Sequence, residues 1–136
     1  DEKYQVKIAD FGLARGSGIQ SKQQMYSTQV QSLWYRCPTL LLGSQKQINI
    51  DMWSIGCIFY ELINGKSMIT AKNEVDAIKK IFSIFGTPNI QEFKGYQNWS
   101  EHYDDYVGIP LNELLGSEDQ NQQDLFSKMM RLDPNQ

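Results

Sequence analysis

A continuous apolar run lies at the centre of the chain. From Ile50 to Ile63 hydrophobic residues fall on nearly every face of a helix. Such a pattern is typical of a helix inside a domain rather than on its surface. Asp51 stands where a first-turn carboxylate meets free backbone N–H groups, and Asn64 and Gly65 supply a left-handed stop. The pattern therefore predicts a buried central helix over residues 51–63.

Shorter patterns predict the remaining elements. Residues 4–9 alternate between apolar and polar positions, which indicates a short strand. Apolar residues at helical spacing predict helices over about 73–85 and 117–132, and Pro38 favours a short helix over 38–42. Ser117 and Gln120 have the spacing of a capping box at the start of the last helix. The expected fold is mainly α, with one short N-terminal β-strand.

Two stretches carry no regular period. Residues 16–31 are polar and rich in Gly, Ser and Gln, so we expect a mobile loop there. Residues 89–116 are irregular but contain several aromatic side chains, which must lie against the rest of the domain. No internal repeat divides the chain, and 136 residues suffice for one domain with a core.

Composition excludes several classes of function. The formal net charge of -3 and the absence of a basic run argue against nucleic-acid binding. The central apolar run is shorter than the roughly 20 residues that cross a bilayer, so no membrane span is expected. Cys37 and Cys57 form neither a disulfide framework nor a metal cluster, which favours a reducing, intracellular compartment, either nucleus or cytoplasm.

An ordered set of motifs points to one family. Asp10-Phe11-Gly12 alone is a weak signal, but here it follows the predicted strand. Four further motifs come after it in order: Leu33-Trp34-Tyr35-Arg36-Cys37-Pro38, Asp51-Met52-Trp53-Ser54-Ile55-Gly56-Cys57, Phe85-Gly86-Thr87-Pro88 and Leu132-Asp133-Pro134-Asn135. The set resembles eukaryotic protein kinases, and its Leu-Trp-Tyr-Arg form is similar to the cyclin-dependent kinases. The resemblance implies that residues 1–136 form part of the large C-terminal lobe of a kinase domain, with strand and Asp-Phe-Gly motif over 5–12.

The resemblance assigns the nucleotide side of the site to the Asp-Phe-Gly motif. Asp10 would chelate the Mg²⁺ that bridges the phosphates of ATP, because a hard cation prefers carboxylate oxygens. Phe11 would pack to set the active or inactive position, and Gly12 would let the backbone turn. The alternative for Asp10 is an ordinary turn acid after a strand.

Residues 10–39 then resemble the activation segment. Ser27 falls at the position of the activating phosphorylation. Thr28 is the alternative, because this loop is slightly longer than the family's usual one and its alignment does not fix a single residue. A phosphate there would order the loop by recruiting arginines, of which Arg15 would be one. The alternative is that both hydroxyls are simply solvated.

The substrate side is implied by the same resemblance. Val30, Gln31 and Arg36 match the wall of the pocket for the residue after the target Ser/Thr, usually proline in this branch. Ser32 matches the residue that touches the catalytic loop.

Two residues at the start of the central helix have a structural role in the family's motif. Asp51 resembles the acid that holds the catalytic loop in place, and Trp53 belongs to the same motif. We interpret Trp34 and Tyr35 as packing residues.

The sequence also departs from the family. The glycine-rich loop, the strand lysine and the His-Arg-Asp…Asn loop precede Asp-Phe-Gly in the family, and this chain begins nine residues before that motif. We therefore expect the isolated chain to hold no ATP or Mg²⁺ tightly and to transfer no phosphate, because phosphoryl transfer depends on positioning and charge stabilisation. Thr39 stands where the family's Ala-Pro-Glu has its glutamate, and the resemblance would place the partner arginine one position after Gln136.

Two main hypotheses for function remain. In the first, the chain is part of a serine/threonine kinase that acts on protein substrates and has a cyclin-like protein as its candidate regulator. In the second, it is a non-catalytic truncated kinase or pseudokinase that only binds other proteins. A remnant without a role is the third alternative. With several family elements absent, we expect an exposed apolar side on the central helix and marginal stability.

Overall fold

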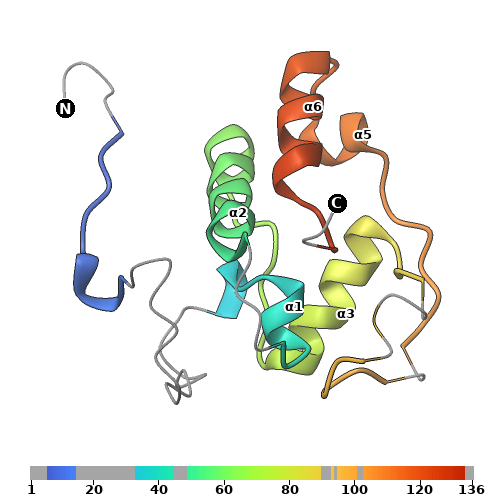
Figure 1. Ribbon diagram of the computed structural model, residues 1–136. Helices are drawn as coiled ribbons and strands as arrows, with labels where there is room; N and C mark the ends of the chain where they lie inside the picture. Colours follow the sequence, from blue (N-terminus) through green and yellow to red (C-terminus); the bar gives the residue numbers. More distant parts are fainter. Residues whose placement is uncertain are drawn as a thin grey trace.

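The computed structural model describes residues 6–14, 33–44, 49–89, 93, 95–100 and 103–133. Its elements, in chain order, are η1 (Phe11–Leu13), η2 (Leu33–Tyr35), α1 (Pro38–Leu41), α2 (Ile50–Asn64), α3 (Glu74–Phe85), α5 (Leu111–Leu115) and α6 (Gln120–Met129). The described part of the chain contains no strand, so the prediction of a mainly helical fold is confirmed. The α-helices gather into one body. Residues 6–14, which include η1, are set off from this body on the side where α2 stands (Figure 1).

The central helix is α2. It ends at Gly65, which has φ 67° and donates its N–H to the Glu61 carbonyl at 2.8 Å. Asn49 precedes the helix with φ 58°, and Asp51 lies in the first turn. These bounds exceed the predicted 51–63 by one residue at each end.

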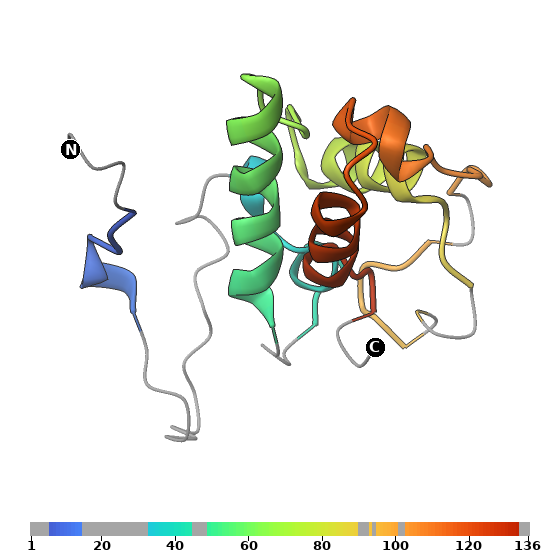
Figure 2. The ribbon, with the colours of Figure 1, turned by 90° about the horizontal axis from the view of Figure 1, so that it is seen from above.

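Only one face of α2 is buried. Trp53, Cys57 and Tyr60 point into the core, whereas Ile58 and Leu62 are 50% and 76% exposed. The expectation of a helix buried all round is therefore wrong for the described residues, while the expected apolar exposed side is present. Figure 2 shows why: α2 stands at the edge of the helical body, with α3 and α6 on one side of it.

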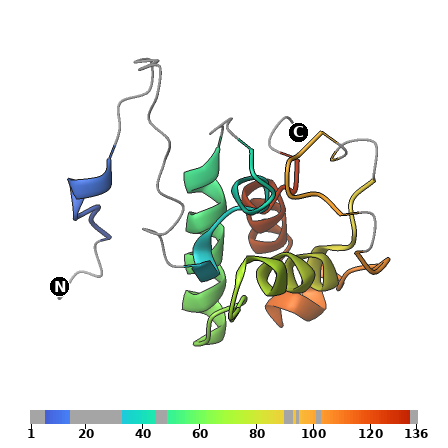
Figure 3. The same cartoon turned by 90° about the horizontal axis from the view of Figure 1, so that it is seen from below.

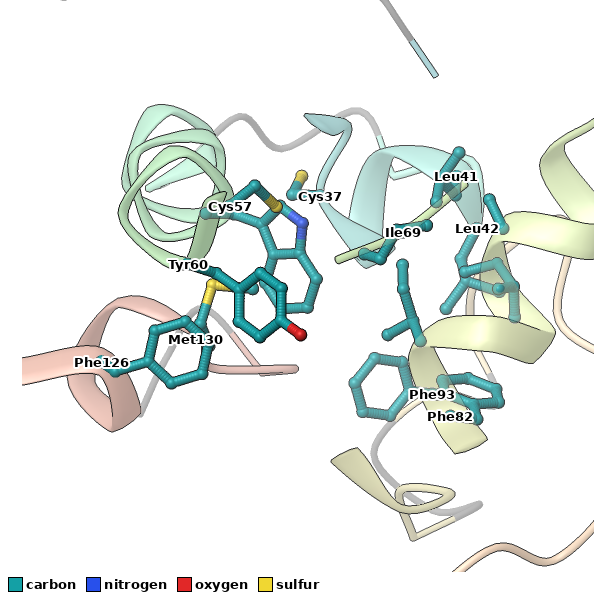
Figure 4. Close-up of a cluster of buried hydrophobic side chains, with 14 of the residues drawn as sticks. Cys37, Leu41, Leu42, Cys57, Tyr60, Ile69, Phe82, Phe93, Phe126 and Met130 are labelled. Atoms are coloured by element: carbon teal, nitrogen blue, oxygen red, sulfur yellow. The ribbon is translucent and has the colours of Figure 1, made fainter. Parts of the chain in front are cut away.

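Close packing joins α2 to the end of α6. A Cβ placed on Gly56 would lie 2.2 Å from Met130 Sδ, so the missing side chain lets that methionine sit directly against the α2 backbone. Phe126 of α6 packs 6.3 Å from both Phe59 and Tyr60, measured between ring centroids. Figure 4 shows Cys57, Tyr60, Phe126 and Met130 gathered between these helices.

The second half of the core surrounds α3. Asn73 caps this helix by accepting the Asp76 N–H at 2.9 Å, and Gly86, at φ 88°, ends it. Phe82 is fully buried and lies 5.3 Å from Tyr103 and 6.0 Å from Trp99. The aromatic residues of the long loop therefore cover α3, as their composition had indicated. Within that loop the structure adds α5, which no periodic pattern had predicted.

Two predicted elements differ from the structure. Residues 6–9 form no strand, and Val6 and Ile8 are 91% and 84% exposed, because no described strand lies beside them to accept their backbone hydrogen bonds. The last helix is shorter than 117–132. Its cap is Asp119, whose carboxylate accepts the N–H groups of Asn121 and Gln122, so Ser117 is not the cap.

Candidate substrate-binding platform

Residues 33–39 are fixed against both large helices. Trp34 donates its indole N–H to the Ala71 carbonyl at 2.9 Å, and Tyr35 donates its hydroxyl to Glu61 Oε2 at 2.7 Å. Ser54 of α2 donates to the Tyr35 carbonyl at 2.9 Å. Figure 3 shows η2 between α2 and the approach to α3. Tyr35 and Trp34 thus do more than pack: their polar groups hold the segment in place.

Arg36 is the charged centre of this segment. Its side chain is 8% exposed, and Nη1 lies 2.7 Å from Glu74 Oε1 in the first turn of α3. A guanidinium in a water-poor position is retained only when it is paired, so the carboxylate fixes the direction in which Arg36 points. Glu74 is 44% exposed, which leaves this ion pair accessible from the solvent side.

The next residues form a buried corner. Pro38 starts α1, and Thr39 is 3% exposed, with its hydroxyl 3.3 Å from Cys37 Sγ. Burial raises the pKa of the Cys37 thiol, and hydrogen bonds to neighbouring groups offset only part of that rise. Burial raises the pKa of the Cys57 thiol, on the facing side of α2, further, to about 12. Both thiols are free and held in the neutral form, which makes them poor nucleophiles.

The Asp-Phe-Gly motif lies in the separate N-terminal segment. Asp10 is exposed and has φ 60° and ψ 65°, a left-handed conformation that is uncommon for a residue other than glycine. Phe11 is 68% exposed at the start of η1, and Gly12, also exposed, lies inside that turn without a positive φ. The structure thus brings none of these three residues to the platform around Arg36.

A magnesium ion fits the described residues only in part. The Asp10 carboxylate is the right kind of donor for Mg²⁺. Among the residues that the structure describes, however, no group of three or more His, Cys, Asp or Glu gathers as a metal site. We therefore derive no step through the metal from this chain.

The two residues of the central-helix motif have different surroundings. Asp51 is exposed in the first turn of α2, where the helix dipole favours its charge. Trp53 is 2% exposed and packs edge-on against Phe85 at 5.5 Å. Trp53 therefore belongs to the core, and Asp51 presents a carboxylate to solvent.

Several predicted residues lie outside the described part of the chain. These are the phosphosite candidates Ser27 and Thr28, the pocket residues Val30 and Gln31, Ser32, Arg15 and the loop over 16–31. Of the predicted substrate pocket, the structure describes only Arg36.

Sequence reasoning missed the partners that fix the platform. Glu74 follows Arg36 by 38 residues and Glu61 follows Tyr35 by 26. Neither acid stands in a spacing that indicates a contact. The one local signal was Glu61 itself, an acid in the last turns of a largely apolar helix.

The helical body and the fixed segment over 33–39 define a kinase-type large lobe. The model of the family described as protein kinase domain matches residues 1–136. The chain therefore belongs to the protein kinase family, whose members use ATP with Mg²⁺ and act on protein substrates. Among the described residues, no helix has the length and apolar character needed to cross a membrane.

Proposed function

We propose that this chain is the substrate-side part of a cyclin-dependent-kinase-like serine/threonine kinase, which transfers the γ-phosphate of ATP to Ser or Thr followed by proline. The observation that carries the proposal is the anchoring of Arg36, buried and paired to Glu74 at 2.7 Å. A guanidinium held in one direction can form part of a pocket wall without moving when substrate arrives. Val30 and Gln31 would complete that wall, and Ser32 would contact the catalytic loop.

The regulated segment would connect this pocket to the metal-binding acid. Asp10 would hold Mg²⁺ in the complete domain, with Phe11 and Gly12 setting its position. Its left-handed backbone supports this role, because strained conformations gather at functional sites. Phosphorylation of Ser27, or of Thr28, would add about two negative charges and order the segment. Asp51 would orient the catalytic loop from the start of α2, and a cyclin-like protein would be the regulator.

The isolated chain would be inactive under this proposal. The sequence contains Asp10, the proposed metal-binding acid, but no His-Arg-Asp…Asn loop and no glycine-rich loop. Since phosphoryl transfer rests on positioning and charge stabilisation, these residues alone would not accelerate it.

A chimera tests the proposal. The upstream half of a known cyclin-dependent kinase, joined before Asp1 and supplied with its cyclin, should phosphorylate a Ser-Pro peptide faster than its Ser-Ala counterpart. The isolated chain should incorporate no labelled phosphate. Asp10→Asn should abolish activity of the chimera, whereas Asp105→Asn, an exposed loop acid, should leave it unchanged. A chimera that unfolds cooperatively yet transfers no phosphate would contradict the catalytic proposal.

A non-catalytic binding role is the second candidate. The exposed apolar face of α2, with Ile55 at 49% and Leu62 at 76%, favours it, because contiguous apolar surface marks contact sites. Thr39, in place of the family's glutamate, is consistent with relaxed selection for catalysis. Capture of a purified cyclin or kinase by the inactive chain, lost on Leu62→Lys, would support this role.

A further inference from the structure

Thr87, just after the end of α3, is the one Ser or Thr in the sequence that precedes a proline. The sequence has 4 prolines, and the other three follow Cys37, Ile109 and Asp133. Residues 86–89 belong to no helix or strand, and Thr87 and Pro88 are half-buried. The proline ring also keeps the residue before it in extended backbone. An active site that recognises Thr-Pro can therefore engage this segment without unwinding a helix.

The Thr87 side chain joins the end of α3 to a distant loop. Its hydroxyl donates to the Asp104 carbonyl at 2.6 Å and accepts the Tyr106 N–H at 3.0 Å. The Thr87 N–H donates to the Tyr106 carbonyl at 2.9 Å. A change at this one hydroxyl therefore acts on residues 17 and 19 positions further along the chain.

The loop that Thr87 holds carries part of the aromatic cover of α3. Tyr103 precedes the bonded residues and lies edge-on to the buried ring of Phe82, with ring centroids 5.3 Å apart. Tyr103 also lies 5.5 Å from Trp99, measured in the same way. The hydrogen bonds of Thr87 thus help to keep this cover closed over the core.

The charges near Thr87 disfavour a second negative group. Asp104 and Asp105 are exposed in the bonded loop, and the Asp104 carboxylate accepts the Tyr106 hydroxyl at 3.0 Å. On the other side, Pro88 borders a cavity of about 260 Å³ whose lining contains Arg131 but also Asp133. That lining therefore offers no net positive charge, and a phosphate beside the two loop acids would meet like charge.

We propose that Thr87 is a phosphorylation site for a proline-directed protein kinase acting in trans, and that its phosphate releases residues 103–106 from the end of α3. The Thr87 Oγ1 attacks the γ-phosphorus of ATP bound by the modifying kinase. The Oγ1–P bond forms, the bond to the leaving ADP breaks, and the hydroxyl proton passes to that kinase's general base. The product has no O–H to donate to the Asp104 carbonyl and carries about two added negative charges. The site does not depend on the catalytic activity proposed for this chain.

Phosphorylation of the purified full chain tests the assignment of the site. An active proline-directed kinase is supplied with ATP, and mass spectrometry of proteolytic peptides locates the phosphate. We expect it on Thr87. Pro88→Ala should slow incorporation by about tenfold or more, whereas Thr70→Val, which removes an exposed hydroxyl not followed by proline, should leave it unchanged. An unmodified Thr87, or equal rates for the wild type and the Pro88 variant, would overturn the assignment.

Amide hydrogen exchange of the ¹⁵N-labelled chain tests the release of the loop. Phosphorylation should speed exchange of the Tyr106 N–H by about tenfold or more, because the hydroxyl that accepts it becomes a phosphate ester. The Met130 N–H, bonded to the Phe126 carbonyl at 3.0 Å, is the internal reference and should not change. Unchanged or slower exchange at Tyr106 would overturn the release.

Three variants separate the lost hydrogen bonds from the added charge. Thr87→Val removes the hydroxyl without adding charge, so it should speed exchange at Tyr106 less than phosphorylation does. Thr87→Ser keeps the hydroxyl, so it should exchange like the wild type and still accept phosphate. In the double variant Asp104→Asn/Asp105→Asn, phosphorylation should have a smaller effect, because the like charges are gone. An equal effect in that variant would contradict the role of repulsion.

Discussion

Two ion pairs of nearly equal length differ in how much water reaches them. Arg36 and Glu74 are 2.7 Å apart with side chains 8% and 44% exposed. Lys128 and Asp124 are 2.6 Å apart with side chains 64% and 61% exposed. The substitutions Glu74→Gln and Asp124→Asn remove one charge from each pair while nearly preserving side-chain size. They therefore isolate the effect of burial.

The expected losses follow from the exposure of each partner. Removing one member of a fully buried pair costs about 3–5 kcal/mol, and an exposed pair contributes about 0.2–1 kcal/mol. Because Arg36 is buried but Glu74 is half-exposed, we expect Glu74→Gln to lower the free energy of unfolding by about 1–2 kcal/mol. Asp124→Asn, an i,i+4 pair in solvent, should cost about 0.3–0.5 kcal/mol.

Urea denaturation followed by far-UV circular dichroism measures both losses. With an m-value of about 2 kcal/mol/M, Glu74→Gln should lower the midpoint by about 0.5–1 M and Asp124→Asn by about 0.2 M. Added salt should shrink the second difference more than the first, since screening acts on exposed charges. Equal midpoints for the two variants would refute the view that burial of Arg36 gives this pair its importance.

Three further outcomes are expected. Phe82→Ala, at a fully buried ring, should cost about 3–5 kcal/mol in the same assay, whereas Ile58→Ala, half-exposed on α2, should cost under about 1 kcal/mol. Asn73→Ala should cost about 1 kcal/mol and reduce helicity, because the Asp76 N–H loses its acceptor. Burial raises the pKa of Cys57 from 9.0 to about 12, so its contribution to stability is full below pH 9 and is lost as the pH rises toward 12. A pH series of unfolding midpoints, compared with Cys57→Ala, measures it; an unchanged difference across that window would contradict it.

Local signals in the sequence located the main helices. The run from Ile50 ends at a glycine that must adopt a left-handed conformation, and Asn73 and Gly86 bracket α3 by capping chemistry alone. These signals act within a few residues, so they can be read without knowing the fold. The motif order was likewise a property of the sequence, and it indicated the kinase family that the family model confirms.

Tertiary structure decided what depends on distant residues. The apolar pattern of α2 could not say which of its faces is covered, because that depends on where α3 and α6 lie. Alternation over 4–9 predicted a strand, but a strand exists only with a partner to bond. Arg36 acquired its partner Glu74 across 38 residues of chain, and only the packed structure shows that the buried Trp53 indole N–H has no acceptor among the described residues. Periodicity and capping are short-range properties of a chain, whereas burial, pairing and cavities arise only where separate segments meet.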